Sequence, residues 1–375
     1  MFKPPLNSSK GDFLPYNVDG CSEQGLQDVE SAPQEEEPTI EDAIDIEAAE
    51  TVDRPPSINE GIRPSKIYEP FSFPVLALLA PASIFGVLAR LGLVALATYD
   101  GESIFPLAYV QALGCFIMGF GLRLKEQFGQ FYGPLYTALT TGFCGSLTTF
   151  SSWQFDVFSS WINISDFRRA GLRDFIDGLG KTVFTLTLSL GSLLFGYSIA
   201  SMLVPHIPAP RFLRRRYRYS LSVIAVLSYA AVFPAYFRLP KDFRPQATAA
   251  LLFAYPGTLT RYTLSVLLNQ RLKAFPLGTF TANSLGTALL GAFHVLQSLH
   301  HPLSPNTCAI LQGLIDGYCG CLTTVSTFAA ETRDLKSWKA WRYVLLSWMM
   351  GQGLLLLIMG SSLWAGPVSK EITCR

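Results

Sequence analysis

The sequence predicts an all-α integral membrane protein: two inverted four-helix repeats joined by a single linking transmembrane helix. Charged residues make up only 15% of the 375 residues, against roughly 25% in soluble domains. Apolar stretches long enough to cross ~30 Å of hydrocarbon recur along the chain. Three segments of the first half also return, in the same order, in the second half.

Nine apolar stretches are long enough to span a bilayer. No apolar signal segment precedes them, so we expect the first span to direct its own insertion. The predicted spans are residues 71–98, 106–124, 133–162, 178–204, 220–237, 247–269, 277–298, 307–333 and 341–364.

The duplication rests on three pairs of matched segments. Their offsets are 171, 170–172 and 175 residues, which indicates a duplicated four-helix unit. We place the first repeat at 67–205, a basic loop with the linking helix at 206–240, and the second repeat at 241–375. The matched segments are GVLAR (86–90) with GTLTR (257–261), PLAYVQALGCFIMG (106–119) with PLGTFTANSLGTALLG (276–291), and TGFCGSLTTFSSWQFD (141–156) with DGYCGCLTTVSTFAAE (316–331).

The linking span sets the relative orientation of the repeats. Four spans return the chain to its starting side, so a fifth makes the second repeat enter from the opposite side. Inverted repeats are typical of transport proteins, whose sites lie where the halves meet. Lys and Arg in the connections favour a cytoplasmic N-terminus and an extracellular C-terminus, although three Arg within 168–173 oppose it. The basic cytoplasmic connections are 123–127, 211–218, 270–273 and 333–342.

Residues 1–66 are acidic and contain few large apolar side chains. Such a segment cannot offset the entropy lost on ordering, so we expect a disordered acidic cytoplasmic tail. A regulatory or partner-binding role for the tail is an open alternative. We expect no nucleic-acid partner, and the duplication within one chain predicts no obligate protein partner.

The seven cysteines and four histidines show no metal-ligand spacing. Cys144, Cys319 and Cys321 lie in apolar segments and are interpreted as small packing residues, so no disulfide framework is expected. The sequence has no Ser–His–acid set, phosphate loop or metal cluster, which argues against an enzyme.

Two basic residues, Arg90 and Arg261, lie inside predicted spans at equivalent repeat positions. A charged side chain at bilayer depth costs about 2.5–3.5 kcal/mol. One interpretation is snorkelling to the interface, because both lie toward the ends of their helices. The other is a pair of vestibule charges that attract an anion.

The third matched pair predicts a helix break inside a span. Residues 142–153 and 317–328 each place two Gly and two adjacent Thr at mid-span. Carbonyls freed inside a bilayer must be satisfied by protein, water or an ion. Two breaks that cross would aim carbonyls at one point, which favours a cation there. Close packing through small residues is the alternative, and it explains the Gly but not both Thr pairs.

Aromatic side chains follow each break at helical spacing: Phe150, Trp153 and Phe328. Ring edges carry partial positive charge, so a narrow ring-lined passage can coordinate a small anion without trapping it. Core packing is the default interpretation of any single Phe, and the repeated context is what favours the passage.

These three motifs resemble the Fluc/CrcB fluoride channel family: G-x-x-x-R, P-x-G-T-x-x-x-N-x-x-G and G-[FY]-C-G-x-L-T-T-[FV]-S-[ST]-[FW]. The resemblance covers roughly residues 71–364, and the third motif is the specific one. The duplicated single chain is similar to the eukaryotic members. The resemblance implies a passive fluoride-selective channel that exports fluoride across the plasma membrane and confers fluoride resistance.

The resemblance also implies site residues, because bacterial relatives are antiparallel dimers with two pores, a central sodium ion and Phe-lined paths. The sodium ion would be held at Gly145, Thr148, Gly320 and Thr323. The resemblance places Asn283, Phe150 and Phe328 in the fluoride pore. Because fluoride needs hydroxyl donors in place of water, Ser326, Thr327 and Ser347 are further candidates on the same side. The vestibule would hold Arg90, Arg261 and Glu331.

The departures from the family pattern predict a single working pore. Repeat one has Gln111 in place of the family's Asn, and its second aromatic residue is Trp153. Repeat two has Val325 in place of its first Phe. Each family pore pairs the first Phe of one subunit with the second of the other. Phe150 would therefore meet Phe328 in one pore, while Gln111, Trp153 and Val325 would line a vestigial one.

Fluoride is small and strongly hydrated, so a pore must replace its water with amide and hydroxyl donors. The larger chloride would be excluded sterically by a narrow ring-lined path. A negative-inside potential favours outward flow by about 2.3 kcal/mol per charge per 100 mV, so no pump is required.

The alternative is a proton-coupled secondary transporter of another small ion or drug, which needs a buried carboxylate at mid-span. The acidic candidates are Asp156, Asp316 and Glu331. Asp156 and Glu331 are equivalent and lie nearer a mouth, whereas Asp316 has Thr141 as its counterpart and no explanation from the sequence.

Overall fold

The computed structural model is helical in the residues that it describes, apart from connections and one antiparallel bridge between Leu299 and Val368. All of these residues belong to one structural unit, Asp45–Arg375. The predicted acidic tail (1–66) lies outside them. The described residues are 68–98, 105–164, 166, 170–208, 211–238, 248–272, 274–300, 303–366, 368 and 373–374.

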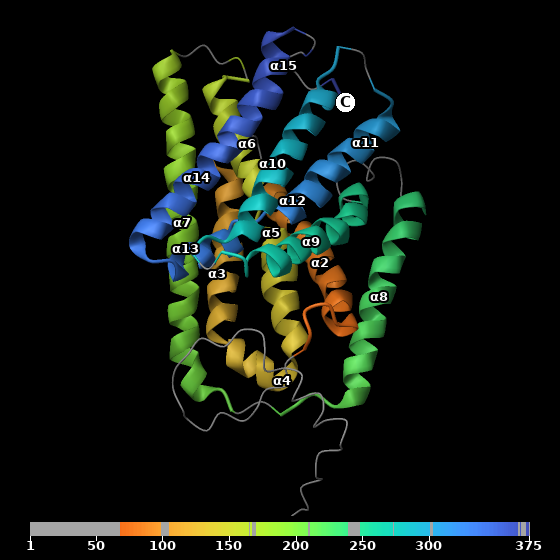
Figure 1. Cartoon of the computed structure of the whole chain (residues 1–375). Coiled ribbons are helices and arrows are strands. Elements are labelled where there is room, and N and C mark those ends of the chain that lie inside the picture. The colour runs from red at the N-terminus through yellow and green to blue at the C-terminus, as the bar shows by residue number, and fades with distance from the viewer. Residues whose placement is uncertain are drawn as a thin grey trace, which may run out of the picture. The chain divides into compact units, whose positions relative to one another are not determined.

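The first repeat has two continuous helices, a broken third and a long fourth (Figure 1). The continuous helices are α2 (Phe73–Ala97) and α3 (Pro106–Arg123). The broken helix consists of α4 (Lys125–Thr137), the π-helix η2 (Ala138–Cys144), α5 (Gly145–Leu147) and α6 (Phe150–Trp161). The fourth is α7 (Gly171–Leu203), which ends in the 3-10 turn η3 (Val204–His206).

After α8 (Arg215–Arg238), the second repeat has the same order of elements. Its continuous helices are α9 (Ala249–Leu268) and α10 (Leu277–Gln297). Its broken helix consists of α11 (Pro305–Gly313), the π-helix η6 (Leu314–Cys319), α12 (Gly320–Leu322) and α13 (Ser326–Asp334). Its fourth consists of α14 (Ser337–Leu355), η7 (Leu356–Gly360) and α15 (Ser361–Trp364).

All nine stretches predicted as spans form helices, some of them broken, in the described part of the chain. Only six helices in this part are both long enough and apolar enough to be candidate membrane spans. The helices α9 and α10 have 20 and 21 residues, and polar side chains such as Arg261, Asn283 and His294 lower their hydropathy. The nine-span count therefore stays a prediction. The six are Phe73–Ala97, Pro106–Arg123, Gly171–His206, Arg215–Arg238, Pro305–Asp334 and Ser337–Trp364.

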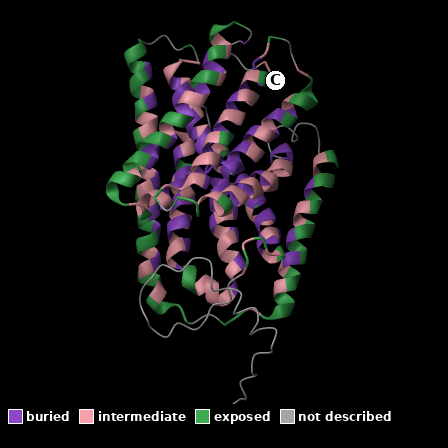
Figure 2. Ribbon diagram, in the orientation of Figure 1, coloured by how far each residue is buried: buried purple, intermediate pink, exposed green. Residues whose placement is uncertain are grey.

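Equivalent helices of the two repeats run in opposite directions. In Figure 1, α3 and α7 run downward, whereas their counterparts α10 and α14 run upward. The broken helices meet between the repeats, where Figure 2 shows the densest burial, and exposure increases toward the outer helices.

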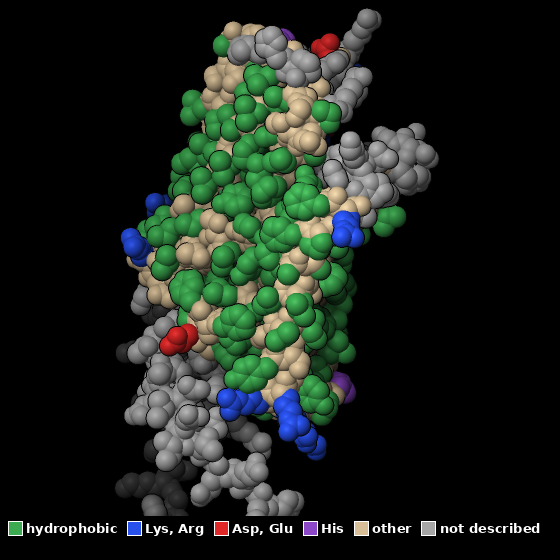
Figure 3. Space-filling view, turned by 90° about the vertical axis from the view of Figure 1, so that its right-hand side faces the viewer, with side chains coloured by type: hydrophobic (Ala, Val, Ile, Leu, Met, Phe, Trp, Pro, Cys, Tyr) green, Lys and Arg blue, Asp and Glu red, His purple; other side chains and the backbone are tan. Residues whose placement is uncertain are grey.

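The outward faces of the helices are apolar. In α8, only Ser222, Ala225 and Val232 are buried, while apolar side chains such as Leu227 and Phe237 are more than half exposed. Figure 3 shows an almost continuous hydrophobic face with Lys and Arg at its lower end. Such a surface suits lipid rather than water, because hydrocarbon imposes no cost on exposed apolar side chains.

Each repeat packs its first helix closely against its π-helix through the glycine of the G-x-x-x-R motif. A Cβ atom on Gly86 would lie 2.7 Å from the Phe143 carbonyl oxygen, and one on Gly257 would collide with the Tyr318 carbonyl. Only glycine permits this approach. It brings the arginine one turn further along each helix to the level of the break.

One expectation about cysteine was wrong. Cys308 and Cys374 form a disulfide that ties the C-terminal segment to the start of α11. The Thr373 hydroxyl also donates to the Gln297 carbonyl (2.8 Å) in this segment. Two isolated cysteines 66 residues apart carry no pairing signal in the sequence. The free cysteines in the described residues, at 115, 144, 319 and 321, are all buried, as expected for Cys144, Cys319 and Cys321.

Candidate functional site

The two helix breaks occur where the paired threonines leave helical geometry. Thr148 has φ −88° and ψ 149°, and Thr323 has φ −96° and ψ 151°. The break that the sequence predicts is therefore present in both repeats. Each break ends one half-helix and begins another, so it frees carbonyls on one side and amides on the other.

The freed amides are capped across the repeats. The Thr148 hydroxyl accepts from the backbone amides of Val325 (3.2 Å) and Ser326 (3.0 Å), at the start of α13. The Thr323 hydroxyl accepts from the amide of Ser151 (3.1 Å), at the start of α6. Each threonine hydroxyl thus caps the start of the other repeat's helix, which gives the Thr in both halves a structural role.

Hydroxyl groups also bond directly across the interface. Thr148 contacts Thr324 (3.1 Å) and Ser326 (3.0 Å), while Thr323 contacts Ser151 (2.9 Å) through side-chain oxygens. All of these residues are buried. The predicted hydroxyl donor Ser326 is therefore already paired. Thr327 is half-buried, and its backbone amide donates to the Thr324 hydroxyl (3.4 Å).

Gln111 and Asn283 clamp the two breaks in the same way. The Gln111 side chain donates to the Thr149 carbonyl (2.7 Å) and accepts from its amide (3.3 Å). The Asn283 side chain donates to the Thr324 carbonyl (3.2 Å) and accepts from its amide (2.8 Å). Each amide side chain satisfies one extended threonine that has no helical partner. The predicted pore residue and its predicted vestigial counterpart therefore make equivalent contacts.

The two buried arginines bind the freed carbonyls of the half-helices. Arg90 donates to the carbonyls of Ser146 (3.0 Å) and Gly320 (2.8 Å), and also to that of Asp316. A cation at the C-terminal end of a helix is favourable, because the unpaired carbonyls carry partial negative charge.

Arg261 makes the matching contacts from the other repeat. It donates to the carbonyls of Cys321 (2.8 Å) and Thr141 (2.8 Å). Arg90 and Arg261 are only 4% and 1% exposed. Both interpretations from the sequence were therefore wrong, because neither side chain snorkels to the interface and neither faces a water-filled vestibule. Ser146 and Asp316, bound by Arg90, are the repeat equivalents of Cys321 and Thr141, bound by Arg261. The sequence alone does not show these contacts, because they depend on how the two repeats pack together.

The central sodium ion stays a prediction, and these contacts do not favour it. The Gly320 carbonyl, one of its four expected ligands, already accepts from Arg90. A Cβ atom on Gly145 would collide with the Arg261 guanidinium, so a second cation lies against that ligand too. Two guanidinium groups repel a further cation. The residues present therefore fit a resident sodium poorly.

The aromatic residues converge as predicted for the intact pair. The rings of Phe150 and Phe328 have centroids 5.6 Å apart, and Trp153 lies edge-on to Phe150 at 5.5 Å. Val325 belongs to the same buried cluster, so Trp153 and Val325, which were predicted to line a separate vestigial pore, lie together with the Phe150–Phe328 pair. Tyr343 of α14 contacts Phe328 at 5.0 Å and is fully buried. Sequence reasoning missed Tyr343, although an aromatic residue four positions before Ser347, on the same helix face, was a usable signal.

Glu331 lies at the end of this ring cluster. One carboxylate oxygen accepts from the Thr279 hydroxyl (2.6 Å) and the Asn269 amide (3.2 Å), and the other accepts from the Tyr343 hydroxyl (2.8 Å). The carboxylate is fixed by three donors.

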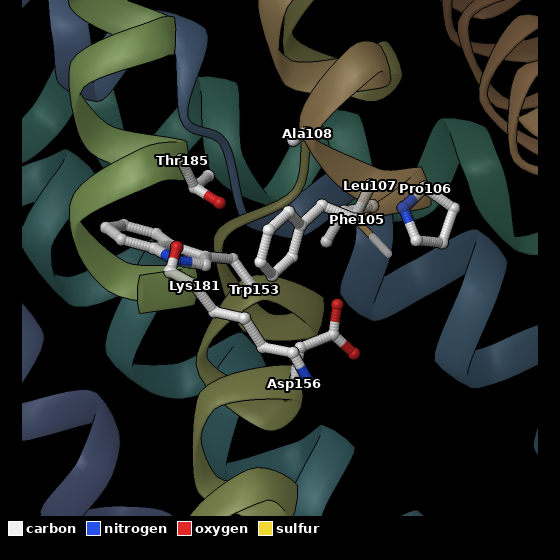
Figure 4. A pocket seen from close by; sticks show the side chains of 8 residues that line it. All are labelled: Phe105, Pro106, Leu107, Ala108, Trp153, Asp156, Lys181 and Thr185. Carbon is white, nitrogen blue, oxygen red and sulfur yellow. The ribbon is translucent and has the colours of Figure 1, made fainter. Parts of the chain in front are cut away.

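The equivalent acid of repeat one has different surroundings. Asp156 lines a cavity of about 250 Å³ with Trp153, Lys181, Thr185 and the 105–108 segment. Figure 4 shows the rings of Trp153 and Phe105 side by side, with Asp156 and the Lys181 chain beneath them. The Trp153 indole donates to the Lys181 carbonyl (3.3 Å), which turns the ring toward α7.

Asp316 now has a structural explanation. Its carboxylate accepts from the Gln312 side chain (2.7 Å), and Gln312 accepts from Gln297 (3.1 Å). Its backbone carbonyl binds Arg90. Asp316 thus belongs to a polar chain that runs from the buried arginine toward the C-terminal segment.

Comparison with known families agrees with this geometry. The family model described as CrcB-like protein, Camphor Resistance (CrcB), matches residues 77–198 and again 248–361. The chain belongs to the CrcB family. The two CrcB matches coincide with the two repeats and leave out α8.

Curated relatives of this CrcB chain include Fluoride export protein 1 of Neurospora crassa, 33% identical over 75% of this chain and 65% of the relative. The match thus spans just under two thirds of that protein. Fluoride export protein 1 of Candida albicans is 32% identical over 78% of this chain and 81% of its own. A Fluoride-specific ion channel FluC of Shewanella frigidimarina is 36% identical over 28% of this chain and 81% of its own. No solved structure matches the chain.

Proposed function

We propose that this protein is a passive fluoride channel that exports fluoride across the plasma membrane. The observation that carries the proposal is the buried ring pair Phe150–Phe328, which packs against Tyr343, the residue whose hydroxyl donates to Glu331. Ring edges are electropositive without carrying a full charge, so an anion can pass without being trapped. The names of the relatives supply the identity of the anion.

The donors along this path are neutral and buried. The Ser347 hydroxyl is 2% exposed and has no hydrogen-bond partner in the described structure. Such a group costs free energy unless something pairs with it, and a partly dehydrated fluoride is a suitable acceptor. The second N–H of Asn283 is a further donor, since its carbonyl contact uses one. One conducting path follows, because Val325 and Trp153 replace the corresponding Phe residues of the other pore.

The two repeats would span the membrane with opposite orientations, linked by α8. The disulfide supports an extracellular C-terminal segment, because disulfides form and persist in oxidising compartments. The opposite side carries the basic connection 211–218 before α8. Excess Lys and Arg mark the cytoplasmic side.

The functional test is anion efflux from liposomes that contain the purified protein. With potassium and valinomycin providing charge balance, we expect rapid fluoride efflux and no measurable chloride efflux. The rate of fluoride efflux should not depend on a pH gradient. Absence of fluoride efflux from a monodisperse protein would contradict the proposal. Efflux that requires a proton gradient would instead support a coupled transporter.

Cysteine labelling tests the orientation. In intact cells, an impermeant maleimide should label Cys308 and Cys374 only after an impermeant reductant is added outside, because the disulfide protects both thiols. Cys21, in the predicted cytoplasmic tail, is the matched control and should label only after permeabilisation. Labelling of the Cys308–Cys374 pair that also requires permeabilisation would reverse the assigned orientation.

A further inference from the structure

Two helices carry polar groups beyond the ring cluster on facing sides. On α14, Tyr343, Ser347 and Gly351 follow at intervals of four residues and share one face. On α6, Phe150 and Gln154 have the same spacing. A Cβ atom on Gly351 would lie 2.9 Å from the Gln154 side chain, so the two faces are in contact there. Gln154 thus lies beyond both the Phe150 ring and Ser347.

The orientation of the Gln154 amide is fixed by its neighbour. The Gln352 amide nitrogen donates to the Gln154 backbone carbonyl (3.0 Å), which can only accept. The same nitrogen also donates to the Gln154 side-chain oxygen (2.7 Å). The side-chain oxygen of Gln154 must therefore face Gln352, and its NH₂ group must point away.

That NH₂ group is buried and unpaired. Gln154 is 0% exposed, and its side-chain nitrogen has no hydrogen-bond partner in the described structure. The Ser347 hydroxyl, one turn earlier along α14, is unpaired as well. These two buried donors have no acceptor, and on α14 Ser347 lies one helical turn before Gly351, the residue that contacts Gln154. Such donors suit a small anion, because an unmade hydrogen bond in a buried site is costly.

We propose that the Gln154 side-chain amide is a further anion-binding donor in the conducting path, one helical turn beyond Ser347. The proposal rests on the proposed channel function. It concerns this path alone, since the duplication places Ala329, a buried residue with no donor, at the equivalent position of repeat two. Gly351 leaves the space that the longer side chain fills.

The experiment compares Gln154→Met with Gln352→Met in fluoride efflux from liposomes. Both variants break the side-chain bond between Gln154 and Gln352, and Gln352→Met also breaks the bond to the Gln154 backbone carbonyl. Only Gln154→Met removes the unpaired donor. A hydrogen bond to an ion is worth about 1.5–3 kcal/mol, so we expect Gln154→Met to lower the efflux rate about tenfold or more. Gln352→Met should keep at least about half of the wild-type rate, because the donor remains.

Gln154→Glu is the second variant and covers the case in which Gln154→Met does not fold. Its carboxylate can still accept from Gln352, so the helix contact survives, but it has no N–H and repels an anion at neutral pH. We expect its efflux to be lost while its elution as a monodisperse protein is retained. Equal rates for Gln154→Met and Gln352→Met, or wild-type efflux from Gln154→Glu, would overturn the inference. No fluoride efflux from wild type would instead count against the channel function.

Discussion

Replacing Phe328 with isoleucine should lower fluoride efflux by up to about tenfold, because the change removes an aromatic ring whose specific contacts are worth about 0.5–1.5 kcal/mol beyond its area. Isoleucine is apolar and branched, so the buried cluster should remain filled and the protein folded. Combined with Phe150→Ile, the loss should differ from the product of the two single losses, because two rings in contact on one path do not act independently. The measurement is the initial efflux rate per folded protein in liposomes.

Val325 provides the matched control, because it occupies the repeat-two position equivalent to Phe150 and lies in the same buried cluster. Val325→Ile adds one methylene and removes no ring, so efflux should stay close to wild type. A loss as large as that of Phe328→Ile would show that packing, and not the rings, controls conduction. A gain of a second pathway in Val325→Phe would support the predicted vestigial pore.

Replacing Arg261 with methionine should destabilise the protein more than any pore substitution. Methionine keeps an apolar stem of similar length but leaves the carbonyls of Cys321 and Thr141 without donors. Each unsatisfied buried acceptor costs about 1–3 kcal/mol, so the total should be several kcal/mol. The measurement is the apparent Tm in detergent together with the yield of monodisperse protein.

Arg261→Lys separates charge from geometry. Lysine keeps the positive charge but cannot present a fork of donors to two carbonyls. We expect it to recover only part of the Tm lost in the methionine variant. Full recovery by lysine would mean that charge alone matters. An unchanged Tm in Arg261→Met would contradict the role of the arginine at the break.

The ring substitutions test the proposed conducting path, whereas the arginine substitutions test how the two helix breaks are stabilised. The arginines, Gln111, Asn283 and the crossed threonines satisfy the backbone that the breaks leave open, and they do so with two-fold equivalence. The ring cluster, Gln154 and the surroundings of Glu331 and Asp156 differ between the repeats. Structural residues have thus kept the symmetry of the duplication, while the residues proposed to contact the ion have lost it, apart from Asn283, which belongs to both groups.

The sequence by itself determined the helical class, the duplication and the places where the third helices break. These follow from local patterns: apolar runs, matched motifs, and Gly–Thr pairs that weaken a helix. It also predicted that Phe150 would meet Phe328, because the repeated motif resembled a family in which such pairs form.

Only the tertiary structure decided what the buried polar groups do. Arg90 and Arg261 read as surface or vestibule charges until the contact between repeats placed carbonyls of both halves around each guanidinium. The Cys308–Cys374 disulfide, the Tyr343 contact to Phe328 and the unpaired Gln154 amide were equally hidden. A hydrogen bond depends on where its partner lies in space, and these partners are tens to hundreds of residues away along the chain.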